Sequence, residues 1–408
     1  MTKNEIVGRL KDGGLDASST NRRAAVYVAD AIAGRAVPGW FAFRIVCDSE
    51  DTERRARAIL SRWYDIDVGG NGVWRMRSKN RVPLMAIKRG GPTPPPPTPT
   101  DGPMYFEAAE ANSTVSLMSG LSTAPNLEYS TDGETWQEWQ HTTAGGTHTF
   151  DTLTLGTIGD RVYLRGDNPN GLADLQSQQI SNFSMTGKIN AGGNIMSLLD
   201  KTMVLTVVPD AGFAMLFADI TEGQNPNTAL LTPPAMDTIT SIGNYGCSGM
   251  YSYCKSLTVA ADMPLLTSIM NEGCSGMYSG CTSLTSAADM PLLTSIGGSG
   301  CSGMYNGCTS LTSAADMPLL TSIGDHGCFD MFGACTSLTS AADMPALTTI
   351  GNAGCGDMYS GCTFAMSSDG TTLNFAFPAP PVTAGGTTYA TAYDIANWMG
   401  NTNGFTTP

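Results

Sequence analysis

Residues 281–297 read CTSLTSAADMPLLTSIG, and residues 308–324 repeat the same 17 letters 27 positions later. Looser copies begin at Cys254 and Cys335. A long period of this kind is the signature of a stacked-repeat architecture, in which each unit contacts only its neighbours. The sequence therefore predicts a solenoid, a class of fold that serves mostly as an extended binding surface.

Apolar residues recur at the same 27-residue period and predict a core. The columns are represented in one unit by Met277, Tyr278, Leu284 and Ile296. Within that unit Cys274 and Cys281 join Met277 and Tyr278 at the spacing i, i+3, i+4 and i+7, which predicts a short helix over residues 274–281.

The next stretch, residues 284–290, alternates and predicts a strand. Leu284, Ser286, Ala288 and Met290 are expected to face inward, because the counterpart of Ser286 in an earlier unit is Val259. A Pro turn and a second short extended piece, LLTSI, complete the unit.

This pattern resembles the BspA-type leucine-rich repeat family, whose unit runs roughly I-G-x-x-A-F-x-x-C-x-x-L-x-x-I before a Pro turn. The matching residues are Ile296, Met304 and Tyr305 in place of Ala-Phe, Cys308 and Leu311. The resemblance covers about residues 213–365. It implies a curved solenoid that serves adhesion or recognition at microbial surfaces, in gut bacteria or their phages.

The rest of the chain predicts a multi-domain protein. The expected parts are a small α/β domain (1–90), a Pro-rich linker (91–102), an all-β sandwich-like domain (103–190), the leucine-rich-repeat solenoid of 27-residue units with an N-terminal cap (191–365) and a C-terminal cap (366–408). The linker contains the run PTPPPPTP, which is typical of a semi-rigid polyproline II spacer. Tyr393, Trp398 and Phe405 are candidates for covering the last repeat.

Local patterns predict the elements of the two smaller domains. In the first, we expect helices over 20–35 and about 48–63 and strands over 39–47, 73–77 and 84–88. In the second, we expect strands over 104–108, 115–118, 127–130, 148–155 and 162–165, with a hairpin turn at Asp132-Gly133. The aromatic residues of the second domain either line a sugar site or fill its core: Tyr105, Phe106, Tyr129, Trp136, Trp139 and Tyr163.

Charge is divided unevenly along the chain. Residues 1–90 contain 17 Lys and Arg against 10 Asp and Glu, a balance of +7, whereas residues 91–408 contain 5 against 26, a balance of −21. The basic part is either an ordinary solvated domain or a site for an acidic protein or nucleic acid. The acidic part is expected to avoid nucleic acid and to suit an exposed surface.

Little in the sequence indicates catalysis. The three histidines are scattered, His326 occupies a position that varies between repeats, and no phosphate-binding loop or HExxH motif appears. We expect a protein that is not an enzyme and needs no cofactor or metal. Ten of the eleven cysteines lie in the repeats with a C-x6-C spacing that does not fit zinc. They are either buried free thiols in ladders or disulfides, although a bridge within one unit would be too long.

Two neighbouring columns are the candidate binding residues. They are Asp262, Asp289, Asp316 and Asp343 in one column and Thr285 and Thr312 in the other. Stacked carboxylates about 5 Å apart repel one another, which a cation would relieve. The alternative is that each Asp accepts backbone N–H bonds in its turn.

The N-terminus lacks the apolar core of a signal peptide, and no run is long enough for a membrane helix. A surface-type repeat without a visible export route favours a phage virion surface protein, fibre or decoration. Residues 1–90 would contact particle proteins, and residues 103–408 would bind a host surface protein or glycan, without membrane insertion. A homo-oligomer is one option for its assembly. The alternatives are a bacterial cell-surface adhesin and a purely structural capsid or tail decoration.

Overall fold

The computed structural model describes residues 24–28, 41–47, 56, 57, 60, 64–68, 73–78, 102–219, 229–363, 373 and 375–400. The chain divides into two compact units, Met1–Pro99 and Thr100–Pro408. Each unit is described by itself.

The first unit contains one antiparallel sheet with the strand order β1-β2-β4-β3. Its strands are β1 (Ala24–Val28), β2 (Phe41–Cys47), β3 (Tyr64–Val68) and β4 (Val73–Ser78). The helix predicted over 20–35 is wrong at residues 24–28, because this Ala- and Val-rich segment pairs with β2 as a strand. Residues 56, 57 and 60 are helical as predicted, and the hairpin strand expected at 84–88 lies outside the described residues.

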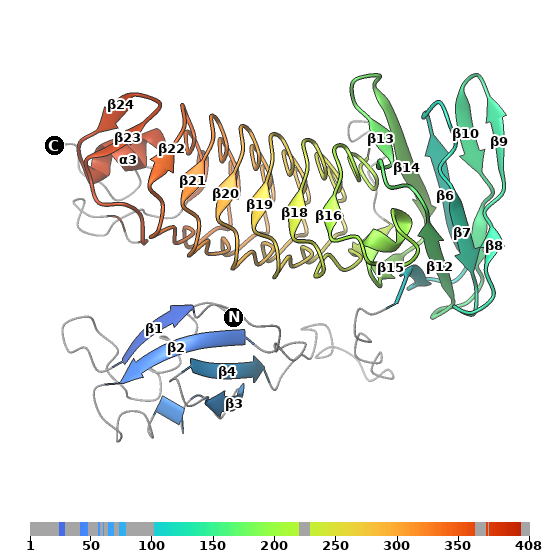
Figure 1. The fold of residues 1–408 in the computed structure, drawn as a ribbon, viewed down its shortest axis with the longest axis horizontal. Coiled ribbons are helices and arrows are strands. Elements are labelled where there is room, and N and C mark those ends of the chain that lie inside the picture. The colour runs from blue at the N-terminus through green and yellow to red at the C-terminus, as the bar shows by residue number, and fades with distance from the viewer. Residues whose placement is uncertain are drawn as a thin grey trace. The chain divides into compact units, whose positions relative to one another are not determined.

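The second unit begins with two six-stranded sheets, at the right of Figure 1. One has the order β13-β14-β6-β10-β9, with β11 also pairing with β6, and the other the order β17-β15-β5-β12-β7-β8. The strands of the first are β6 (Ser113–Ser119), β9 (His141–Ala144), β10 (Thr147–Phe150), β11 (Leu153–Leu155), β13 (Ala173–Asp174) and β14 (Gln179–Thr186). The strands of the second are β5 (Met104–Ala108), β7 (Leu127–Ser130), β8 (Gln137–Glu138), β12 (Arg161–Gly166), β15 (Ile189–Gly192) and β17 (Leu230–Thr232).

Alternating burial in β5 and β12 shows why the sequence forms these strands: every second side chain enters the core. Phe106 of β5 meets Phe183 of β14 edge to face, with 5.1 Å between ring centroids. The strand predicted over 148–155 is wrong in one respect, since it is two strands, β10 and β11, that both pair with β6.

The solenoid follows as a row of short parallel strands (Figure 1). They are β16 (Val207–Val208), β18 (Ser241–Ile242), β19 (Ser268–Ile269), β20 (Ser295–Ile296), β21 (Ser322–Ile323) and β22 (Thr349–Ile350). From β18 onward each strand pairs with the residues 27 positions away. One 27-residue period of the sequence therefore forms one unit of the solenoid.

Two local predictions for the repeat are wrong. The segment 284–290 is irregular, and the sheet is built from the second extended piece instead. Ser286 is exposed and Val259 is 40% exposed, so that column faces solvent. Leu284, Ala288 and Met290 are buried as predicted.

The predicted helix over 274–281 is also wrong, although its apolar face is buried as expected. Backbone N–H groups alternate between two uses: that of Met277 bonds to Cys274 within the unit, and that of Tyr278 bonds to Met304 in the next unit. Glu272, Gly276 and Gly280 have positive φ, and a left-handed residue at every fourth position prevents a continuous helix. The segment is therefore a string of turns that hydrogen-bonds like a sheet.

An aromatic column passes through the middle of the stack. Stacked rings lie 5.1–5.6 Å apart from Phe183 through Phe217, Tyr251, Tyr278, Tyr305, Phe332 and Tyr359. Since Phe183 belongs to β14, the sandwich and the solenoid share one hydrophobic core. Such pairs stabilise a fold by about 0.5–1.5 kcal/mol each beyond the apolar area that they bury.

Both ends of the stack are covered. At the first end the Phe183 N–H of β14 bonds to Leu216. At the other end the carbonyls of Trp398 and Met399 accept the N–H groups of Asp357 and Tyr359. This cap consists of β23 (Val382–Ala384), β24 (Thr387–Tyr389) and the helix α3 (Ala392–Trp398), while a short 3-10 helix, η2 (Ile195–Leu198), lies between sandwich and solenoid. Trp398 thus takes part in the cap, and Phe405 lies outside the described residues.

The tyrosine column allows a matched test of buried hydrogen bonds. The Tyr278 hydroxyl accepts the Ala261 N–H at 3.0 Å, whereas the buried Tyr251 hydroxyl has no partner because the corresponding residue is Pro234, which lacks an N–H. We expect Tyr278→Phe to lower the free energy of unfolding by about 1 kcal/mol and Tyr251→Phe to leave it equal or higher. Thermal unfolding of the two variants measures the difference, and equal losses would contradict this account.

Candidate functional site

The predicted Asp column hydrogen-bonds along the stack. Asp262 Oδ1 accepts the Asp289 N–H at 3.0 Å, and Asp316 Oδ1 accepts the Asp343 N–H at the same distance. Asp343 Oδ1 in turn accepts the Ala376 N–H of the C-terminal cap at 2.7 Å. These carboxylates therefore hold neighbouring units together, and their binding of a ligand stays a prediction.

The predicted Thr column also uses its polar groups within the stack. Thr285 Oγ1 donates to the Thr258 carbonyl at 3.0 Å, and Thr312 Oγ1 donates to the Thr285 carbonyl at 3.2 Å. A second Thr ladder lies beside the sheet, where Thr294 Oγ1 donates to Thr267 and Thr321 Oγ1 to Thr294. The threonine hydroxyls of both ladders therefore donate their hydrogen bonds to a neighbouring unit.

The turn segments form a further face of the solenoid, apart from the Asp and Thr columns, here called the turn face. It consists of residues 244–253, 271–280, 298–307, 325–334 and 352–361. Its outward positions differ from unit to unit, beginning with Tyr245, Glu272, Ser299, His326 and Ala353. All five of these residues have positive φ between 50° and 57°. The sequence showed His326 to be variable but did not show this shared backbone conformation.

Two side-chain contacts fix polar groups on the turn face. Tyr245 Oη donates to Glu272 Oε1 at 2.8 Å, and Asn306 Nδ2 donates to Asp330 Oδ2 at 2.6 Å. Partial burial raises the pKa of the Asp330 carboxyl above its ordinary value. Tyr245 and Tyr253 remain 37% and 41% exposed, respectively.

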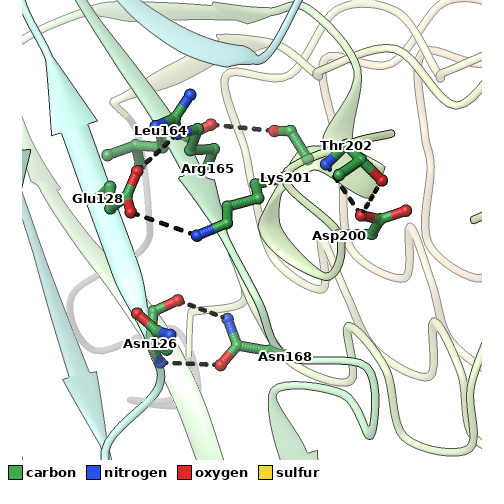
Figure 2. A network of polar contacts seen from close by, with 9 residues as sticks. Asn126, Glu128, Leu164, Arg165, Asn168, Asp200, Lys201 and Thr202 are labelled. Carbon is green, nitrogen blue, oxygen red and sulfur yellow. Dashed lines mark hydrogen bonds and ion pairs between the residues drawn. The ribbon is translucent and has the colours of Figure 1, made fainter. Parts of the chain in front are cut away.

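Three of the five cations of residues 91–408 pair with glutamates of the β5–β12–β7 sheet, namely Arg161, Arg165 and Lys201. Figure 2 shows Glu128 between Arg165, whose Nε lies 2.6 Å from Oε2, and Lys201, whose Nζ lies 3.6 Å from Oε1. The hydrogen bond from Arg165 lowers the pKa of Glu128. Asn168 fastens the same region by bonding to the backbone of Asn126 and Leu198.

Arginine side chains lie over two of the aromatic rings considered for a sugar site. The Arg165 guanidinium lies over the Trp136 ring at 4.0 Å, and that of Arg161 lies over Tyr105 at 4.4 Å. Of the other aromatics considered for a sugar site, Phe106 and Trp139 are buried in the core. These contacts favour the structural interpretation of the aromatics over a sugar platform.

Ten cysteines line the solenoid interior as free, buried thiols. One ladder donates to carbonyls of the preceding unit, as Cys281 Sγ does to Tyr251 at 3.1 Å. Burial raises the pKa of Cys362 to about 11 and that of Cys328 to about 12. The thiols are therefore protonated and poorly nucleophilic at neutral pH.

We expect these thiols to resist a disulfide reagent in the native protein and to react once denaturant is added without reductant. Because their folded pKa values exceed the ordinary value of 9.0, stability is full below about pH 9 and falls as the pH rises through the folded values. Thiol titration and alkaline melts measure both effects. Fast native reaction, or few thiols after denaturation, would contradict the free-thiol ladder.

Within the described ranges, no group of three or more His, Cys, Asp or Glu side chains is arranged to hold a metal ion. His148 is held by Thr143 Oγ1 at 2.8 Å and the Leu121 carbonyl at 3.0 Å. In the same part of the chain, no helix is both long and apolar enough to cross a membrane.

Comparisons with known proteins place the chain only loosely. No protein-family model matches it, and a search of curated proteins found no match. One similar solved structure is a leucine-rich repeat protein from Bacteroides ovatus, with 20% identity and a TM-score of 0.26. The match covers 42% of this chain and 38% of that one.

Proposed function

We propose that the chain is a non-enzymatic surface protein in which the second unit is a rigid binding arm and residues 1–90 attach it to a particle. The observation that carries this proposal is the doubly capped stack. β14 hydrogen-bonds to the backbone at one end, and the carbonyls of Trp398 and Met399 accept backbone N–H groups at the other. Capped solenoids stay rigid and soluble while they present side chains along an extended face.

The charge division supports separate partners for the two units. The basic residues 1–90 suit an acidic surface of the particle, whereas the acidic remainder suits outward display. The Pro-rich run between them has the composition of a spacer. In its specific form the proposal is a phage virion fibre or decoration protein whose arm binds a host surface protein or glycan.

Attachment and binding are tested separately, because the chain divides into two compact units. Tagged residues 1–99 and 100–408 are each expressed while the particle assembles, and purified particles are washed at rising salt. We expect residues 1–99 to co-purify and to be released by salt. Incorporation of residues 100–408 alone would reverse the proposed orientation.

Binding is measured with residues 100–408 immobilised on beads and exposed to host cells. Retention of the cells supports a binding arm. If residues 1–99 enter the particle but residues 100–408 retain no cells, the protein is a structural decoration without a receptor.

A further inference from the structure

The two most similar repeats differ only on the turn face. Residues 271–297 and 298–324 are identical except at Asn271/Gly298, Glu272/Ser299 and Ser279/Asn306. All three differences fall in the turn segments. The remaining faces are unchanged, including exposed positions such as Thr285 and Ser286.

The fourth repeat differs from the third mostly on the same face. Compared with the third, it brings Asp325, His326, Phe329, Asp330 and Ala334 to the turn face. Outside the turn face these two repeats differ at Leu319/Ala346 and Ser322/Thr349, so most of the differences gather on the turn face. Differences among the units are therefore concentrated on the turn face, although the first unit also differs from the second at Lys255/Thr282, Val259/Ser286 and Met270/Gly297.

The backbone indicates that the varied side chains have a role. Glycine is the least strained residue at positive φ, and Gly249, Gly276 and Gly303 occupy one such column of the turn face. The column of Tyr245 has the same left-handed backbone but contains no glycine in five units. Folding alone would favour glycine there, since each side chain adds roughly 1–2 kcal/mol of strain.

The exposed chemistry of the turn face is acidic and aromatic. None of its five segments contains Lys or Arg, while Glu272, Asp330 and Asp357 supply negative charge. Tyr253 contacts Gly280, where a Cβ atom would come within 2.5 Å of its ring, and it remains exposed. A carboxylate beside an exposed ring, as Glu272 is beside Tyr245, suits Lys or Arg side chains, through ion pairs and cation–π contact.

We infer that the turn face is the recognition surface of the arm and that it binds a basic segment of a partner protein. The inference rests on the proposed function for the existence of a partner and adds the face and the partner's chemistry. The hydrogen bonds of Tyr245 to Glu272 and of Asn306 to Asp330 hold the acidic groups in place before binding. Preorganised groups lose less entropy on binding.

The test uses substitutions that remove side chains without harming the fold. In the full chain, Tyr245→Gly, Glu272→Gly and His326→Gly are combined, and each relieves a left-handed residue. The matched control combines Ser286→Ala, Ser313→Ala and Ser340→Ala, which are exposed in neighbouring units outside the turn face. A second variant, Asp330→Gly with Asp357→Gly, removes charge at two further left-handed positions.

The probes are a random-peptide array that spans basic, neutral and acidic sequences and a glycan array of neutral and acidic sugars. We expect basic peptides to bind the wild-type chain and the serine control. For both glycine variants we expect affinity to fall about tenfold or more with the melting temperature equal or higher, since tenfold corresponds to about 1.4 kcal/mol. Rising salt should also weaken binding.

No bound peptide, a preference for acidic peptides, or binding that survives both glycine variants would overturn the inference. Glycan binding that the glycine variants abolish would also overturn it, by assigning the face to sugars. The proposed function is judged independently by cell retention. If the triple-glycine variant retains cells as well as the wild type does, the inference fails and the proposed function stands. If basic peptides bind the wild-type chain but cells are not retained, the proposed function fails and the assignment of the turn face stands.

Discussion

Leu311→Asp is expected to unfold the central units of the solenoid. Leu311 is fully buried in a column with Leu284 and Leu338, and no cation lies on the neighbouring turn segments to pair with a carboxylate there. Burying an unpaired charge costs at least several kcal/mol, which is comparable with the total stability of about 5–15 kcal/mol of a typical domain. The measurement is a thermal melt followed by far-ultraviolet circular dichroism.

The control for this substitution is Ser313→Asp, two residues later in the same unit and exposed. It adds the same charge to solvent and should leave the melt nearly unchanged. Acidification should partly restore the Leu311→Asp variant, because a protonated carboxyl is cheaper to bury. Equal midpoints for the two variants would remove the inward assignment of the Leu column.

Deletion of the C-terminal cap is expected to cause association, whereas deletion of one whole repeat should not. Loss of residues 364–408 removes the carbonyls of Ala376, Trp398 and Met399 and exposes a buried end of the stack. Unprotected ends of this kind pair with other chains. Loss of residues 281–307 instead joins Gly280 to Cys308 in the original phase, so every ladder continues.

Light scattering after size-exclusion chromatography measures both outcomes. The in-phase deletion should behave as the intact chain does, with a somewhat lower melting temperature, since one interface is lost. The cap deletion should form larger species at the same concentration. A cap deletion with unchanged size and melt, or an unfolded in-phase deletion, would contradict the account of the ladders.

The period of the sequence predicted the solenoid and its buried columns well. Met277, Tyr278, Leu284 and Ile296 all enter the core, because burial between stacked units removes apolar columns from water. The position of the strand within the unit could not be found the same way. Alternation over residues 284–290 indicated a strand, yet the ladder forms at Ser295–Ile296, where a two-residue segment carries no pattern of its own.

The turn segments show a second limit. Spacing of Cys274, Met277, Tyr278 and Cys281 predicted burial correctly and conformation wrongly. The available signal was Gly276 and Gly280, four residues apart on the exposed side, where a helix would favour other residues. Glu272 and its counterparts also have positive φ but are not glycines, so the sequence does not reveal their left-handed conformation.

Only part of the candidate site could be predicted from the sequence. The Asp and Thr columns were visible as repeats, but their inter-unit hydrogen bonds depend on the stacking geometry of the folded chain. The aromatic residues of the sandwich divided between core and surface, as Trp139 and Trp136 illustrate, and composition alone does not separate them. Variation on the turn face was visible at His326 and needed the structure to become a surface.

The inter-unit hydrogen bonds have a mechanical consequence, because they join successive rungs along the length of the stack. Force applied between β14 and α3 would break the hydrogen bonds between one pair of neighbouring units after another. It would not shear all of these bonds at the same time. Each released unit of 27 residues would add roughly 90 Å of extended chain, at about 3.3 Å per residue. An arm of this construction would lengthen in steps under tension and dissipate energy while both of its ends stayed attached.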